Sequence, residues 1–288
     1  MKQIYILLIA LLMGLSAKAE SSGTCGANLT WHLTDDGVLT ITGTGKMDNY
    51  LYSVAPWYYR DVKQIIIGDG VTTIGQAAFR NRGSLTSVTI PNSVTEIGFR
   101  AFEDCRALTS INIPNSVTEI GDYAFYNCSE LTSVTIPNSV TEIGDYAFYN
   151  CSELTSVTIP NSVTRIGDLA FSGCRSLKNF TFGSGLRSIG QGAFSDCFNI
   201  TQISSEAVVP PICDSGAFYG INKYKCKLIV PKNRLHSYQW AYQWGDFLLI
   251  EGSTTLGITN TVYNNSGLAD VNTIDGTKRL SKASTDEI

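Results

Sequence analysis

The chain has 288 residues, of which 43% are hydrophobic and 16% are charged, and its formal net charge at pH 7 is −4. This weakly acidic balance argues against a nucleic-acid partner, because proteins that bind nucleic acids need a basic patch or stripe. The length would suit two globular domains, but a solenoid of stacked repeats needs no such division.

Residues 1–19 have the pattern of a secretory signal peptide. Lys2 gives a positive start, residues 4–15 form an apolar run, and Ala17-Lys18-Ala19 fits a cleavage site with small residues. The run is too short to span a bilayer, and no later stretch is longer and equally apolar. We therefore expect an exported protein, at the cell surface, released or periplasmic, with no membrane span in the mature chain.

Residues 20–61 predict an N-terminal β cap. The alternation of Leu29, Trp31 and Leu33, an Asp36-Gly37 turn and the run at 38–42 are typical of a β-hairpin. Five aromatic residues of this stretch could stack on sugars, but terminal repeats need covers, so we favour a role in sealing the core. They are Trp31, Tyr50, Trp57, Tyr58 and Tyr59.

Residues 62–225 are built from a 23-residue repeat, which is clearest at residues 131–153, LTSVTIPNSVTEIGDYAFYNCSE. The copy before it, residues 108–130, differs at only two positions. A fixed period of this length predicts a solenoid of about seven stacked coils. An Ala-Phe pair marks these coils at Phe79, Phe102, Phe125, Phe148, Phe171, Phe194 and Phe218.

Each coil is predicted to contain short strands and a short helical turn. Val134 and Ile136 flank an outward Thr135, which has the period of a strand. Gly144 can adopt a positive φ and so permit a sharp corner. Asp145 can cap the helical turn that points Phe148 inward.

The repeat L-x-x-V-x-I-P-x-S-V-x-x-I-G-x-x-A-F-x-x-C, over residues 62–218, resembles the BspA-type leucine-rich repeat of bacterial secreted and surface proteins. The resemblance implies a right-handed leucine-rich repeat superhelix. It also implies attachment to host matrix, host cells or other bacteria. The stretch GTCGANLTWHLTDDGVLTITGTGKM resembles the N-terminal module of this family, and C-x-L-x-V-P at residues 226–231 resembles its C-terminal closure.

Residues 226–252 predict a C-terminal cap made of a strand at 226–230 and a helix at 233–245. Tyr238 with Tyr242, and Trp240 with Trp244, have i, i+4 spacing and are expected to form a lid. Residues 253–288 are polar and lack the repeat, so we expect a tail that is partly disordered. Its VNTIDGTKRLS segment faintly resembles the start of a bacterial sorting segment, but a frayed terminus is the favoured interpretation.

Eight cysteines in an exported chain raise the question of disulfides. Cys213 and Cys226 flank one excursion near the cap and are the candidate disulfide. Five others share one repeat position and are expected to stack as buried free thiols, because side chains in a ladder point in parallel. These are Cys105, Cys128, Cys151, Cys174 and Cys197. The sequence has no C-x-x-C motif and no His-Cys cluster, which are the patterns typical of zinc sites. We therefore expect no metal or cofactor.

The titratable residues do not predict an active site. The two histidines, His32 and His236, lie in opposite caps, so no triad could include both. The acidic rows recur from coil to coil, whereas an active site occurs once; the rows are Asp122, Asp145 and Asp168, and Glu96, Glu119 and Glu142. We expect a non-enzymatic protein, with a carbohydrate-active enzyme using paired carboxylates as the residual alternative.

Two repeated surfaces are candidate sites for a protein or glycan ligand. One is the outward hydroxyl-rich face of the strands, which includes Thr132, Ser133, Thr135, Thr155, Ser156 and Thr158. The other is the tyrosine set Tyr123, Tyr126, Tyr146 and Tyr149. Each has a plainer interpretation: binding hot spots favour Trp, Tyr and Arg over Ser and Thr, and the tyrosines could cover the edge of the core. A further alternative is a structural spacer whose caps or tail make the contacts.

Overall fold

The computed structural model describes residues 21–51 and 54–255, which belong to one compact unit, Met1–Gly257. The predicted signal peptide and residues 256–288 of the predicted tail lie outside the described residues. Among the helices within the described ranges, none is long and apolar enough to cross a membrane.

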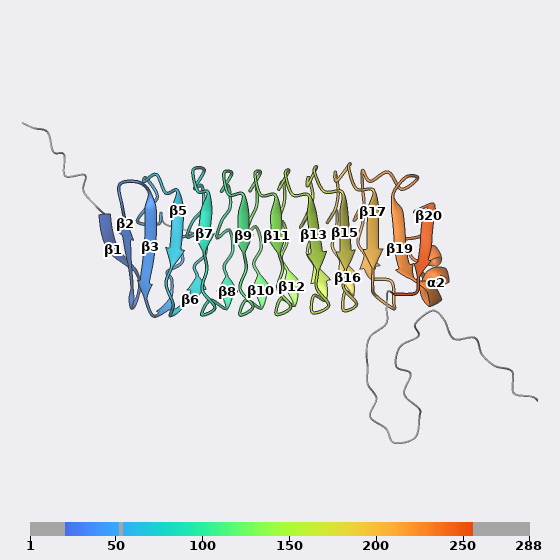
Figure 1. The fold of residues 1–288 in the computed structure, drawn as a ribbon, viewed down its shortest axis with the longest axis horizontal. Helices are drawn as coiled ribbons and strands as arrows, with labels where there is room; N and C mark the ends of the chain where they lie inside the picture. Colours follow the sequence, from blue (N-terminus) through green and yellow to red (C-terminus); the bar gives the residue numbers. More distant parts are fainter. Residues whose placement is uncertain (1–20, 52–53, 256–288) are drawn as a thin grey trace, which may run out of the picture. The chain divides into compact units, whose positions relative to one another are not determined.

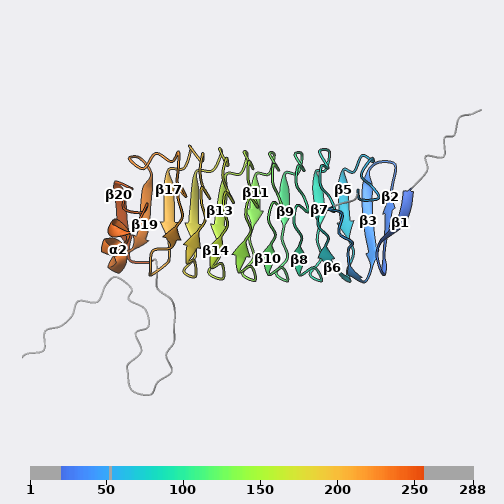
Figure 2. The same cartoon turned by 180° about the vertical axis from the view of Figure 1, so that it is seen from behind.

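The described chain forms the predicted solenoid, in which successive coils lie side by side in chain order (Figure 1; Figure 2). The first sheet has the order β1 (Ser21–Gly26), β2 (Leu29–Leu33), β3 (Val38–Gly43), β5 (Gln64–Ile67) and β7 (Ser87–Thr89). A second sheet has the order β9 (Ser110–Asn112), β11 (Ser133–Thr135), β13 (Ser156–Ile159), β15 (Asn179–Phe182), β17 (Gln202–Ser205), β19 (Lys227–Pro231) and β20 (Leu249–Ser253).

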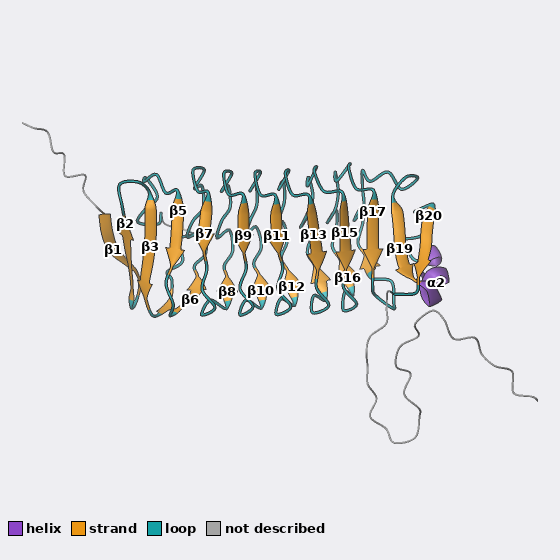
Figure 3. Cartoon of the chain, in the orientation of Figure 1, coloured by secondary structure: helices purple, strands orange, loops and turns teal. Residues whose placement is uncertain are grey.

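A third sheet collects the short second strand of each coil. Its order is β4 (Gly45–Lys46), β6 (Val71–Ile74), β8 (Glu96–Ile97), β10 (Glu119–Ile120), β12 (Glu142–Ile143), β14 (Arg165–Ile166), β16 (Ser188–Ile189) and β18 (Ile212–Cys213) (Figure 3). Strands of successive coils pair in parallel at equivalent repeat positions, such as Val134 with Ile111. The repeat therefore sets the register of both long sheets.

The core is a column of phenylalanine rings. Neighbouring rings from Phe79 to Phe194 stack with centroids 5.1 to 5.4 Å apart, and both Leu131 and Phe148 are fully buried. One coil cannot bury these rings alone, so neighbouring coils complete its core.

The parallel stacking begins before residue 62 and continues beyond residue 225. β2 and β3 form the predicted antiparallel hairpin, but β3 also pairs in parallel with β5. Trp57 is fully buried, stacks on Phe79 at 5.6 Å and donates its indole N–H to the Ala78 carbonyl at 2.8 Å. At the other end, β19 and β20 extend the second sheet.

The corner of each repeat differs from the prediction. Gly144 does not have a positive φ; instead, a Cβ there would lie 2.6 Å from the Asp122 nitrogen of the previous coil. Glycine is required by the close approach of two backbones. Turns replace the expected helical turn, because Tyr146 and Asn150 have left-handed φ values of 57° and 55° and donate their N–H groups to the next coil.

The C-terminal helix is shorter than predicted. A 3-10 turn, η1 (Lys232–Arg234), leads into α2 (Leu235–Trp240), which ends because Ala241 has extended backbone angles. The two predicted pairs are split: Tyr238 and Trp244 are buried, whereas Trp240 and Tyr242 are 80% and 69% exposed. Half of the predicted lid residues therefore face solvent.

The predicted Cys213–Cys226 disulfide is absent, and this prediction is wrong for this structure: both are buried free cysteines. Cys213 ends β18 in the third sheet and Cys226 precedes β19 in the second, so no strand pairing places the two residues side by side. The five ladder cysteines are buried free thiols, as expected.

Candidate functional site

A groove of about 500 Å³ runs along β11 and β13 and reaches the carboxyl end of β15. It crosses four successive coils, the last of which contributes Glu206, the residue after β17. Its lining residues are Ser133, Val134, Thr135, Ile136, Asn138, Ser156, Val157, Thr158, Ile159, Pro160, Asn161, Thr181, Gly183 and Glu206.

The groove lies where the repeat changes. In the near-identical coils a proline follows the strand and lacks an N–H, so the ladder stops there. Gly183 and Glu206 take this position in the later coils and donate their N–H groups to the Ile159 and Phe182 carbonyls at 2.8 and 2.9 Å. A Cβ on Gly183 would lie 2.5 Å from the Pro160 carbonyl carbon, so only glycine fits this close approach.

Four of the predicted hydroxyl residues meet in this groove: Ser133, Thr135, Ser156 and Thr158. Thr132 and Thr155 do not line it. Their hydroxyls donate to the backbone carbonyls of Thr109 and Thr132 at 3.1 and 3.2 Å, so they connect neighbouring coils. The predicted surface therefore divides into residues free to meet a ligand and residues that hold the stack.

The polar lining is uncharged except for Glu206. Hydroxyl and amide groups can both donate and accept hydrogen bonds, which suits a ligand rich in polar groups. The sequence analysis missed Asn138, Asn161, Gly183 and Glu206. The available signal was the departure of Gly183 and Glu206 from the proline of the repeat.

The predicted tyrosines form two stacks, which we call the tyrosine ridge. Tyr123 stacks on Tyr146 with centroids 4.6 Å apart and an 8° angle, and Tyr126 stacks on Tyr149 at 4.9 Å and 5°. The four rings are half-buried. Because the rings cover one another's faces, the ridge offers ring edges and hydroxyls more than open faces. The pKa values of Tyr123 and Tyr126 are raised, mainly because the rings are partly removed from water. The stacked neighbours, Tyr146 and Tyr149, are the second cause.

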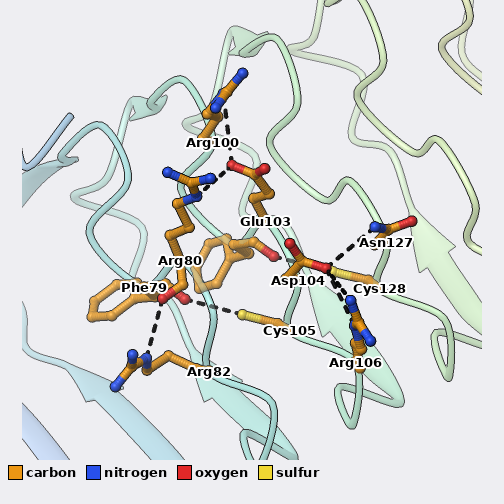
Figure 4. Close-up of polar contacts among 11 residues, drawn as sticks. Phe79, Arg80, Arg82, Arg100, Glu103, Asp104, Cys105, Arg106, Asn127 and Cys128 are labelled. Carbon is orange, nitrogen blue, oxygen red and sulfur yellow. Dashed lines mark hydrogen bonds and ion pairs between the residues drawn. The ribbon is translucent and has the colours of Figure 1, made fainter. Parts of the chain in front are cut away.

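Figure 4 shows a cluster of ion pairs among Arg80, Arg100 and Glu103, in the coils that precede the tyrosine ridge. Arg100 and Glu103 occupy the repeat positions of Tyr123 and Tyr126. Glu103 Oε2 lies 2.9 Å from Arg80 Nε and 3.6 Å from Arg100 Nε. Burial raises the pKa of Glu103 despite these two arginines. The Arg100 guanidinium also lies 4.9 Å from the Tyr123 ring centre, so the cluster joins the aromatic stack.

The acidic rows and cysteines connect coils. Asp145 accepts the Asp168 N–H at 2.9 Å, rather than capping its own coil as predicted, and it pairs with Arg165. Cys128 Sγ donates to the Phe102 carbonyl at 3.3 Å, and the equivalent bond of Cys105 is visible in Figure 4. Burial raises the pKa of Cys105 to about 12, so its nucleophilic thiolate is disfavoured at neutral pH. Within residues 21–51 and 54–255, no group of three His, Cys, Asp or Glu residues is placed to hold a metal.

Comparisons with known proteins agree with the repeat pattern. A family model described as "BspA type Leucine rich repeat region", with six copies, matches residues 55–164 and 141–243. No curated protein is significantly similar to the chain.

Several solved structures are similar to the chain. The T. pallidum leucine-rich repeat protein TpLRR is 31% identical, with 62% of this chain and 91% of that chain covered and a TM-score of 0.47. A leucine-rich repeat protein from Eubacterium ventriosum is 23% identical, with 74% and 79% covered and a TM-score of 0.36. The pneumococcal vaccine antigen PcpA is 11% identical, with 82% and 100% covered and a TM-score of 0.41.

Proposed function

The chain belongs to the BspA-type leucine-rich repeat family, and from that premise we propose that it is an exported, non-enzymatic adhesion protein. The groove across β11, β13, β15 and Glu206 receives a protein or glycan ligand outside the cell. The sequence pattern of residues 1–19 supports export.

One observation carries the proposal: four predicted hydroxyl residues from two coils converge in a groove of about 500 Å³. Ligand sites are concave and hold a small number of placed polar groups, and the groove has both properties. The outward side chains of Thr135 and Thr158 are exposed there, so they are available to a ligand.

The composition of the groove supports binding over catalysis. Hydrolysis of a glycosidic bond by paired carboxylates needs two acidic groups that flank the bond. Glu206 is the one acidic residue among those that line the groove. A carbohydrate-active enzyme at this groove would need an acid that the lining does not contain.

The test places one large charged side chain in the groove. Thr158→Arg should weaken binding to a ligand found on glycan and matrix-protein arrays by at least tenfold, because a bulky charged side chain would project into the middle of the groove. Thr118→Arg is the matched control: Thr118 is also exposed but precedes β10 in the third sheet. Equal binding by Thr158→Arg and the unchanged protein would contradict the proposal, as would turnover of an arrayed glycan.

The near-identity of residues 108–130 and 131–153 favours a second candidate, in which the middle coils are a spacer. Deleting residues 131–153 separates the two candidates. In the deleted protein residues 108–130 take the place of the removed coil, so Ser110, Asn112 and Asn115 replace Ser133, Thr135 and Asn138. The groove then loses the hydroxyl of Thr135, and a binder that uses this hydroxyl should lose affinity. A spacer whose caps or tail make the contacts should keep it.

A further inference from the structure

We propose that the groove recognises an extended basic segment of a protein partner, with a lysine or arginine of that segment paired to Glu206. This inference rests on the proposed function of the groove and names the class of its ligand.

Glu206 is an uncompensated charge within a neutral site. Among the described residues its carboxylate has no ion pair or hydrogen bond, although its backbone N–H is held by the Phe182 carbonyl at 2.9 Å. The side chain is half-buried and is the one charged group of the lining. Lys178 precedes β15, at the opposite end of the paired strands β15 and β17. A cationic group is the complement of such a site.

The neutral part of the groove has the length of a short extended peptide. Four coils separated by about 4.8 Å span about 14 Å, which matches about four residues of extended chain. The main chain of such a segment has an N–H and a C=O at each residue that need partners. The hydroxyls of Thr135 and Thr158 and the amide of Asn138 can supply both kinds of partner. The Asn161 amide oxygen already accepts the Ser184 N–H at 2.7 Å, and its NH2 group can donate.

The same geometry disfavours two other modes of recognition. β11, β13, β15 and β17 are each paired on both sides, so a segment cannot join the sheet as an added strand at this site. No aromatic side chain lines the groove, so a sugar ring has no face to stack on. Recognition therefore depends on side chains, and Glu206 supplies its charge selectivity.

Peptide libraries test the proposal on the full chain purified after export. Two fluorescent octapeptide libraries of Ser, Gly and Asn carry one fixed lysine or one fixed acetyl-lysine, and binding is followed by fluorescence polarisation. The lysine library should bind at least tenfold more tightly, because acetylation removes the charge. Glu206→Gln should abolish this difference. Glu153→Gln removes an exposed carboxylate outside the groove. This control variant should keep the preference for the lysine library.

The possible outcomes are distinct. Equal binding of the two libraries, or an unchanged lysine preference in Glu206→Gln, would overturn the inference. Binding of chitosan oligomers that depends on Glu206, without binding of the lysine library, would assign the cation to an amino sugar and also overturn it. An uncharged array ligand that is lost in Thr158→Arg but kept in Glu206→Gln would leave the proposed function standing and remove only this inference. Matching thermal melts of Glu206→Gln and the unchanged protein exclude unfolding as the cause of a loss.

Discussion

The middle coils, residues 108–153, and the last coils, residues 177–225, share the same repeat but have different surfaces. Within the described middle coils no large hydrophobic side chain is exposed, and the two copies differ at two positions. The last coils replace the repeat proline with Gly183 and Glu206. They also expose Phe198, Val209, Ile212, Tyr219 and Tyr224.

The contrast indicates how a repeat protein acquires a groove. Identical coils stack in register and produce a regular surface, on which threonine hydroxyls are used to join coils. A groove forms where the sequence departs from the repeat and the strand ladder lengthens from three residues in β11 to four in β13 and β15. The proposed groove therefore combines repeated hydroxyls with two departures from the repeat, Gly183 and Glu206.

The largest expected effect concerns the cysteine ladder, which joins the two regions. Burial raises the pKa of Cys105 and Cys197 to about 12 and raises those of Cys128, Cys151 and Cys174 as well. The native thiols keep their protons, whereas the thiols of the unfolded chain have a pKa near 9. Their contribution to the free energy of unfolding is therefore fully present below about pH 8 and is lost as the pH rises. Cys25, Cys213 and Cys226 add to this effect, because burial raises the pKa of each to about 12. We expect a loss on the order of 10 kcal/mol between pH 8 and pH 10, with roughly 1 kcal/mol from each of the eight buried thiols.

Urea unfolding at the two pH values measures this loss. Cys151→Ala should remove about one eighth of the pH dependence, because one of the eight buried titrating thiols is gone. Equal stability at pH 8 and pH 10 would contradict the burial of the ladder.

The next effect tests the ring column. Phe148→Ala should lower the free energy of unfolding by about 3–5 kcal/mol, because Phe148 is fully buried between Phe125 and Phe171 at 5.2 and 5.1 Å. Phe218→Ala in the last coil is the comparison: Phe218 lies 6.1 Å from Phe194 and packs edge-on against Trp244 at 4.9 Å.

Hydrogen exchange distinguishes the two variants. Phe148→Ala should lower protection on both sides of the middle coils, whereas Phe218→Ala should lower it mainly at the C-terminal end, because each coil contacts only its neighbours. Uniform loss of protection in both variants would argue against coil-by-coil stability.

The smallest expected effect is the difference in stability between two Gly→Ala substitutions. Gly144→Ala should destabilise the protein by about 1–3 kcal/mol, because its Cβ would press on the backbone of residues 121 and 122. Gly83→Ala is the control, since a Cβ there meets nothing within 4 Å and its φ is not positive. A thermal melt in which Gly144→Ala equals Gly83→Ala would refute the close approach of the coils.

The repeat predicted more of the fold than of the site. The period, the inward Leu131 and Phe148 and the buried cysteine ladder follow from the spacing of apolar residues, and the structure confirms them. The predicted helix at 233–245 is longer than α2, because i, i+4 spacing does not reveal that Ala241 has extended backbone angles. These angles end the helix between Tyr238 and Tyr242. The Cys213–Cys226 disulfide was predicted from proximity in sequence, which does not indicate that the two residues belong to different sheets.

By itself, the sequence determined that the chain stacks as a solenoid, because one coil leaves its apolar face exposed and an identical neighbour covers it. Only the tertiary structure decided which repeated hydroxyls remain available and where the surface is hollowed. Those properties depend on backbone contacts between residues more than 20 positions apart, such as the hydrogen bonds that Gly183 and Glu206 donate to the Ile159 and Phe182 carbonyls.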